Sequence, residues 1–145
     1  MEKQYVLPLQ IRWADLDVNG HLRHTVYYDW GSFCRISFLN QHGLTLSRLQ
    51  ELQIGPILFS ENCHFKKEIF MEDEVTINLE LLNAKRSFIK WSIRHQIIKN
   101  EMLAAELVVV GSWIHNVRRR VVMPPQQAVD VYNLMPRAKD FEWLD

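Results

Sequence analysis

Residues 13 to 30 read Trp-Ala-Asp-Leu-Asp-Val-Asn-Gly-His-Leu-Arg-His-Thr-Val-Tyr-Tyr-Asp-Trp, and no other stretch says as much about the fold. A carboxylate, an amide and an imidazole recur here at alternate positions, at Asp17, Asn19 and His21. The chain then enters a helical stretch, whose first turn has N–H groups without intrahelical acceptors and therefore favours negative charge. The stretch predicts a corner between a strand and a helix where a developing oxyanion could be stabilised, as acyl chemistry requires.

A long helix is predicted directly after this corner. From Val26 to about Gln41 the apolar residues recur with helical period, and His42-Gly43 is a typical helix end. Apolar side chains occupy most of the circumference, in stripes that include Val26, Trp30 and Phe33, and Tyr27, Cys34 and Phe38. Such a helix is better explained as enclosed by a sheet than as lying on a surface.

About five strands are predicted around this helix. The first runs from about Tyr5 to Trp13, and four follow the helix. Apolar and polar residues alternate at positions 74 to 81 and 89 to 97, which is typical of strands with one buried face. Positions 102 to 114 are apolar almost throughout, which favours a central strand covered on both faces, by the helix and by another element or subunit. Short polar connectors favour antiparallel hairpins, and Pro124-Pro125 opens a short helix to about Leu134.

Length and composition indicate one domain, residues 1–145, because 145 residues with 48% hydrophobic content can bury one substantial core but not two. The formal net charge is zero, which argues against nucleic acid or an anionic membrane as a partner. The chain starts Met-Glu-Lys-Gln-Tyr, without the pattern of a signal peptide, and its apolar runs are too short to span a bilayer. We therefore expect a soluble cytoplasmic protein without membrane insertion.

Neither the cysteines nor the histidines indicate a disulfide framework or a metal site. Cys34 and Cys63 are too few and too far apart for such a framework, so we expect two buried thiols. The remaining histidines show no metal-ligand spacing; they include His42, His64, His95 and His115.

The run Asp-Leu-Asp-Val-Asn-Gly-His at 15 to 21, followed by a Tyr-rich helix, resembles the hotdog-fold acyl thioesterases, both the hydroxybenzoyl-CoA thioesterase group and the acyl carrier protein thioesterases. The resemblance continues at Gly55-Pro56-Ile57, at 71 to 75, at 111 to 114, at 118 to 120 and at Pro124-Pro125, so it covers nearly the whole chain. These families often continue the histidine with Val-Asn-Asn, where this chain has Leu-Arg-His. That departure concerns substrate detail and leaves the acid, amide and imidazole intact.

The resemblance implies an α+β hotdog fold, in which a bent antiparallel sheet of about five strands wraps one long central helix. It implies an acyl thioesterase that hydrolyses acyl-CoA or acyl-carrier-protein thioesters to a free acid and a thiol, without a metal or other cofactor. We also expect a homodimer or homotetramer, because one helix covers only one face of such a sheet. A non-catalytic module that binds acyl-CoA or acyl carriers is the alternative. A hotdog dehydratase is a further enzyme class, but dehydratases have a different His-and-Asp pattern, which this sequence lacks.

Asp17 is the strongest catalytic candidate, since a carboxylate near a helix N-terminus can attack a thioester or activate water as a general base. The alternative role for Asp17 is structural, as a carboxylate that caps the helix or stabilises the turn. Asp15 would share its strand face as an electrostatic neighbour if the strand persists. His21 could hold Asp17, position water or protonate the leaving thiolate, and otherwise is a buried histidine bonded to backbone. Asn19 could orient water or the carbonyl, although Asn-Gly is also a turn dipeptide.

Two further groups of residues are assigned binding roles. The backbone N–H groups of His24 and Thr25 are the oxyanion candidates, because the first helical turn falls there. The candidates for the phosphates of CoA or of a phosphopantetheine arm are Arg118, Arg119, Arg120, Arg86 and Lys90. A solvated charge run is the commoner explanation of Arg118 to Arg120, and Arg86 and Lys90 are equally plausible partners for the phosphates. Glu61 and Asn62 could border the site of a neighbouring subunit, or lie on an exposed strand face.

Overall fold

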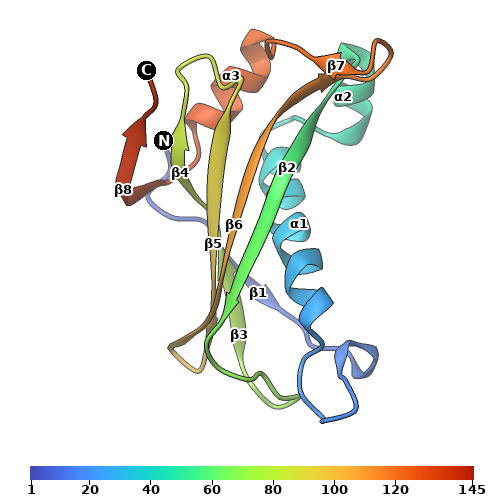
Figure 1. Cartoon of the computed structure of the whole chain (residues 1–145), viewed down its shortest axis with the longest axis vertical. Helices are drawn as coiled ribbons and strands as arrows, with labels where there is room; N and C mark the ends of the chain where they lie inside the picture. The colour runs from blue at the N-terminus through green and yellow to red at the C-terminus, as the bar shows by residue number, and fades with distance from the viewer.

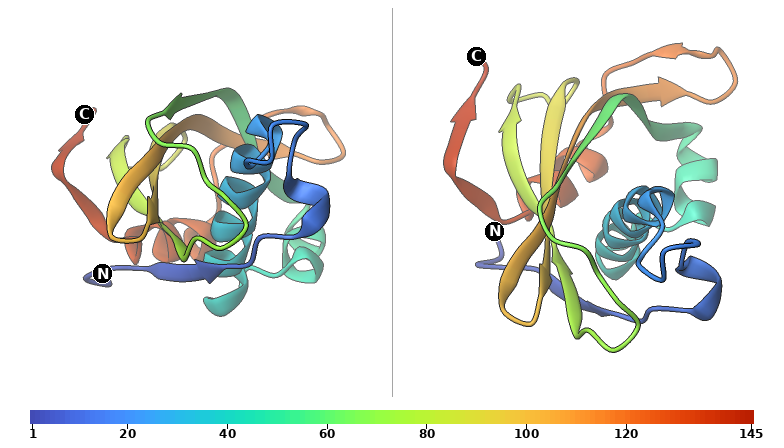
Figure 2. Two further views of the ribbon diagram at one scale, coloured as in Figure 1. Left: turned by 90° about the horizontal axis from the view of Figure 1, so that it is seen from below. Right: turned by 60° about the horizontal axis from the view of Figure 1, so that its bottom comes forward.

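The computed structural model describes residues 1–145, and its architecture is one long helix against one curved sheet (Figure 1). Helix α1, His24–Gln41, lies along the concave side of the sheet (Figure 2). It begins slightly before the predicted start at Val26 and ends where His42-Gly43 predicted an end. The predicted bent antiparallel sheet around a long helix is confirmed.

The sheet has eight strands: β1 Val6–Leu9, β2 Ile54–Phe65, β3 Val75–Asn78, β4 Glu80–Ala84, β5 Trp91–Lys99, β6 Met102–His115, β7 Arg120–Val121 and β8 Arg137–Trp143. β2 pairs with β6, β6 with β5, and the other edge of β5 with β3 and β4 in succession. β1 extends the sheet beside β3, and β8 beside β4. Every pairing is antiparallel except that of β4 with β8.

The core fills the space between α1 and the concave face of the sheet. The inner side of α1 buries Trp30, Cys34 and Phe38 among others, against β-strand residues such as Ile93 and Leu107. The outer side of α1 stays open, with Phe33 and Ile36 exposed, so the sheet encloses only part of the helix. From Ala105 to Gly111 strand β6 alternates between fully and partly buried positions, and its second face is fully buried only at Ala104 and Ser112, so the predicted cover on both faces is only partial.

Two short helices complete the fold, at the end of the molecule where α1 finishes (Figure 1). Helix α3, Gln126–Asn133, follows Pro124-Pro125 as predicted, with Pro125 as its N-cap. Helix α2, Leu46–Leu52, and the strands β7 and β8 were not predicted. No helix is long and apolar enough to cross a membrane.

The prediction of a first strand from Tyr5 to Trp13 is wrong in its second half. β1 ends at Leu9, and a 3-10 helix, Trp13–Asp15, follows. The cause is the carboxylate of Asp15, which accepts a hydrogen bond from the Arg12 N–H at 2.9 Å and pairs with the Arg12 guanidinium at 2.7 Å. Asp15 is therefore buried in a local turn and does not share a strand face with Asp17.

Candidate active site

Asp17 and His21 lie at the two ends of a tight turn just before α1. Leu16 and Leu22 pair as an antiparallel bridge, and within it the Asp17 N–H donates to the His21 carbonyl at 2.9 Å. The Gly20 N–H closes the turn on the Asp17 carbonyl at 3.1 Å, with Gly20 at a φ of +80°, a conformation that glycine adopts without steric cost. The turn therefore fixes both side chains relative to the start of α1.

The carboxylate of Asp17 faces the ring of His21. Asp17 Oδ1 accepts the N–H groups of Asn19 at 2.8 Å and His21 at 3.3 Å, and Oδ2 lies 3.1 Å from His21 Nδ1. The two side chains are 27% and 26% exposed, so solvent reaches both. A carboxylate offers about four lone-pair positions, so these three contacts leave Asp17 able to accept a further hydrogen bond.

A pocket of about 310 Å³ opens beside this pair. Its lining comes from the turn, from the start of α1 and from the end of β2: Asp17, His21, Leu22, His24, Tyr27, Phe65, Lys66, Lys67 and Glu68. Tyr27 packs edge-on against Phe65, with ring centroids 4.9 Å apart. Burial raises the pKa of Tyr27 to about 12, so its hydroxyl stays protonated at neutral pH.

The N-terminus of α1 at this pocket has no cap. Arg23 occupies the N-cap position without a capping hydrogen bond, and the first turn carries no acidic residue. The N–H groups of His24 and Thr25 precede the first intrahelical bonds and donate to no other group. The helix therefore presents uncompensated positive partial charge beside Asp17, which suits an oxyanion.

The structure brings together only part of the candidate set. Asn19 uses its backbone N–H to hold Asp17, while its side chain is exposed and does not line the pocket. The β6–β7 turn and the β4–β5 turn lie at the opposite end of the molecule from the start of α1 (Figure 1). These turns and β7 carry the proposed phosphate-binding cations Arg118, Arg119, Arg120, Arg86 and Lys90, so none of them reaches Asp17 of the same chain.

Lys66 and Lys67 are the cations that do line the pocket, and they were missed from the sequence. The available signal was a basic pair directly after a long strand, but nothing local indicates that this strand ends beside Asp17.

Cys34 is buried as expected, whereas Cys63 is only partly buried; neither forms a disulfide. No group of three or more His, Cys, Asp or Glu is placed to hold a metal ion.

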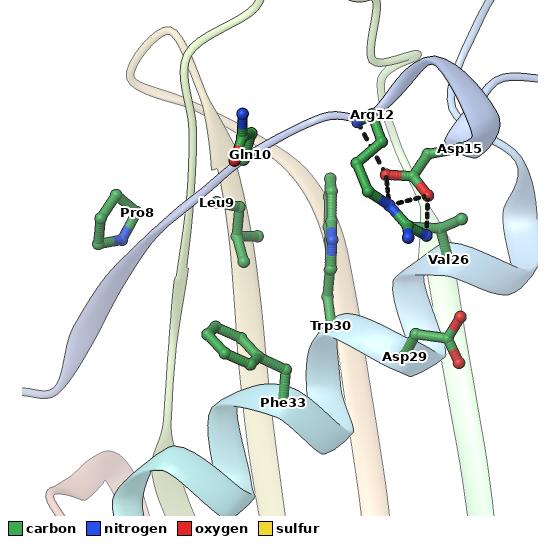
Figure 3. Close-up of a pocket in the computed structure, with 9 residues that line it drawn as sticks. All are labelled: Pro8, Leu9, Gln10, Arg12, Asp15, Val26, Asp29, Trp30 and Phe33. Carbon is green, nitrogen blue, oxygen red and sulfur yellow. Dashed lines mark hydrogen bonds and ion pairs between the residues drawn. The ribbon is translucent and has the colours of Figure 1, made fainter.

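A second pocket, of about 380 Å³, lies between β1, the 3-10 helix and α1 (Figure 3). Arg12 and Asp15 are already paired with one another, on the segment that forms one side of the pocket. Hydrogen bonds from Arg12 lower the pKa of Asp15, so that carboxylate stays ionised and bound. Asp29 lies on α1, apart from the segment that carries this pair, and makes no hydrogen bond to it (Figure 3). Asp15 therefore has a structural role in holding the chain ahead of Asp17.

A curved antiparallel sheet around one long helix, with an acid and an imidazole at the start of that helix, defines a hotdog-fold protein. Residues 11–131 match the family model of the thioesterase-like superfamily. The chain belongs to this superfamily.

Relatives of known structure share the fold over most of the chain. A Staphylococcus aureus protein solved in complex with CoA is 19% identical, with a TM-score of 0.83 over 96% of this chain and 90% of its own. A 1,4-dihydroxy-2-naphthoyl-CoA thioesterase from Synechocystis is 17% identical, with a TM-score of 0.80 over 90% of this chain and 96% of its own. A relative from Aquifex aeolicus, whose name assigns it provisionally to the esterases, is 22% identical over 129 residues, 88% of this chain and 96% of its own.

Proposed function

We propose that this protein hydrolyses acyl-CoA thioesters to a free acid and CoA, with Asp17 as the reacting carboxylate. The observation that carries the proposal is the Asp17–His21 pair, 3.1 Å apart, in a pocket at the uncapped start of α1. Membership of the thioesterase-like superfamily supports the reaction class. The relative solved with CoA and the relative named for a CoA thioester support CoA, rather than a carrier protein, as the thiol.

Two routes are open to Asp17. As a general base it takes a proton from water while the water oxygen attacks the thioester carbon; the C–S bond then breaks and the thiolate takes up a proton. As a nucleophile it forms an acyl anhydride with release of the thiol, and water then hydrolyses the anhydride. In both routes His21 orients the carboxylate, and the N–H groups of His24 and Thr25 stabilise the oxyanion.

The remaining pocket residues supply binding rather than chemistry. Lys66 and Lys67 offer ammonium donors on the pocket wall beside Asp17, suited to the amide carbonyls of the pantetheine arm of CoA. Tyr27 and Phe65 offer aromatic surface for an acyl group close to the carboxylate. Because CoA thioesters are intracellular metabolites, we place the protein in the cytoplasm.

The direct test is the variant Asp17→Asn, which keeps the shape of the side chain and removes the base or nucleophile. We expect thiol release from a panel of short-chain, long-chain and aromatic acyl-CoA substrates to fall about a hundredfold or more. His21→Ala should cost less, because it removes only orientation. Asp29→Asn is the matched control, since Asp29 is an exposed carboxylate on α1 outside this pocket. Circular dichroism checks folding, and full activity in folded Asp17→Asn would exclude Asp17 from the mechanism.

A binding module without catalysis is the second candidate, favoured by one observation. Both backbone contacts of Asp17 Oδ1 lie within its own turn, as expected of a carboxylate that only shapes a loop. In that case wild-type protein binds acyl-CoA but releases no thiol from CoA or carrier-protein thioesters. Isothermal titration calorimetry on the same panel separates the two functions.

A further inference from the structure

A groove between α1 and β2 contains a partly buried arginine, Arg35, that the thioesterase site does not use. The groove has a volume of about 220 Å³. Its lining consists of Ser32, Arg35, Ile36 and Leu39 of α1, Pro56 and Leu58 of β2, Trp91 of β5 and Tyr132 of α3. We call this space the Arg35 groove. Tyr27 and Phe65, at the Asp17 pocket, do not line it.

The charge of Arg35 is only loosely compensated. Its side chain is 11% exposed, and its nearest carboxylate oxygen, on Glu61, lies 4.0 Å away. Its closer partners are neutral: Nη1 donates to His95 Nε2 at 3.0 Å, and Nη2 to Ser32 Oγ at 3.2 Å. His95 can accept because its Nδ1 faces the Asn78 carbonyl at 2.8 Å and its ring is fully buried and neutral. A buried cation with neutral partners leaves part of its desolvation cost unmet.

Two aromatic residues add hydrogen-bond donors to the groove lining, Trp91 and Tyr132. The indole Nε1 of Trp91 is buried and has no hydrogen-bond partner. The Tyr132 side chain, which carries a phenolic hydroxyl, is buried, and its ring centroid lies 5.4 Å from that of Trp91. Burial raises the pKa of Tyr132, which keeps this hydroxyl a donor at neutral pH. A guanidinium, an indole N–H and a phenol among the lining residues together select a ligand with anionic acceptor oxygens.

The apolar residues of the lining indicate that the rest of the ligand is an apolar chain. Ile36, Leu39 and Pro56 also line an adjoining pocket of about 550 Å³ between α1, α2 and the start of β2. This second pocket adds the apolar side chains Leu46, Leu49 and Ile54. An alkyl chain that starts at Arg35 could therefore continue over apolar surface toward α2. Mostly apolar walls with a few convergent polar groups are typical of small-molecule sites.

We propose that the Arg35 groove binds an alkyl carboxylate, whose head group pairs with Arg35 and whose chain lies toward α2. The planar guanidinium matches a carboxylate in geometry as well as in charge. Glu61 serves as the weak counter-ion of Arg35 in the free protein, and the ligand carboxylate takes over this role. The proposal does not depend on thioester hydrolysis at Asp17.

The test measures binding of decanoate and of decanol, which share an apolar chain and differ in the charged head group. By isothermal titration calorimetry we expect wild type to bind decanoate about tenfold or more tightly than decanol, as for a hydrogen bond to a charged group. Arg35→Met should abolish this preference. Arg48→Met is the matched control, because Arg48 lies on α2 outside both pockets, and it should retain the preference.

A second variant keeps the proposal testable if Arg35→Met does not fold. Glu61→Gln removes the competing carboxylate at a partly exposed position and should tighten decanoate binding several-fold, with decanol unchanged. In proton–nitrogen correlation spectra, decanoate should shift the indole N–H signal that is lost in Trp91→Phe. Equal affinity of wild type for decanoate and decanol, weaker decanoate binding by Glu61→Gln, or an unmoved Trp91 signal would overturn the proposal.

Discussion

His95 lies at the centre of the core, and burial lowers its pKa to about 3 from the ordinary 6.5. Between these two values the unfolded chain binds one proton more than the folded chain does, so the free energy of unfolding falls as the pH falls from about 6.5 toward 3. From pH 7 to pH 5 this single group should cost about 2 kcal/mol of stability. Urea unfolding at the two pH values measures the loss.

Other groups also titrate in this range, so the comparison variant is His95→Gln. Its amide can donate to the Asn78 carbonyl and accept from Arg35, as the neutral imidazole does, but it cannot be protonated in this pH range. The stability of this variant should therefore depend less on pH than that of wild type, by the same amount. An equal pH dependence of the two proteins would mean that His95 takes up no proton on unfolding in this range.

How far single residues could be predicted depended on whether their partners are close in sequence. Asp17 and His21 are four positions apart, so their spacing already suggested that they act together, and the structure brings them into contact. Lys66 reaches the same pocket only through the path of β2 along α1, which no local pattern encodes. The prediction that Asp15 lies on a strand was wrong because Arg12, three residues earlier, binds its carboxylate and the extended chain ends there.

At the scale of elements, two glycines set how closely neighbouring segments pack. A Cβ on Gly111 of β6 would lie 2.4 Å from the Trp91 ring and 2.5 Å from the Ile57 carbonyl oxygen, which belongs to the backbone of β2. A Cβ on Gly31 of α1 would instead meet the end of the Leu107 side chain at 2.4 Å. The obstacle is rigid in the first case and a flexible side chain in the second.

We therefore expect Gly111→Ala to lower the free energy of unfolding by about 1–3 kcal/mol or more, the cost of overpacking a well-filled core. Gly31→Ala should cost clearly less, because alanine in a helix is favoured over glycine by about 1 kcal/mol and offsets part of the clash. Guanidinium unfolding of both variants gives the comparison. A larger loss of unfolding free energy for Gly31→Ala would show that the packing of α1 tolerates an added methyl group less well than the packing between β2, β6 and β5.

The elements that were predicted are those with a strong hydrophobic period. α1 and β6 each bury a regular set of side chains, so their patterns were visible. β8 buries only Ala138 fully; it pairs with β4 and packs the partly buried Phe141 and Trp143 against the core, so its sequence shows no regular alternation. α2 buries no residue fully, and its one local signal was Thr45, whose side chain accepts the Arg48 N–H as an N-cap.

At the scale of the whole molecule, the open feature is the outer edge of the sheet. β2 is twelve residues long, pairs only with β6 and leaves its other edge unpaired (Figure 1). Phe59 and Phe65 on this strand are 60% and 51% exposed. A long edge strand with exposed aromatic residues is a ready template for pairing with another chain.

We therefore predict that β2 of one chain adds to β2 of a second chain, so that the protein is at least a dimer. Light scattering at micromolar concentration should give a molar mass at least twice the 17.3 kDa of one chain. Phe59→Lys places a charge on the proposed interface and should shift the protein toward monomer with its circular dichroism unchanged. Met102→Lys, at an exposed apolar position at the start of β6 beyond the stretch paired with β2, should leave assembly intact. A wild-type monomer at that concentration, or equal effects of the two substitutions, would show that this edge is not an interface.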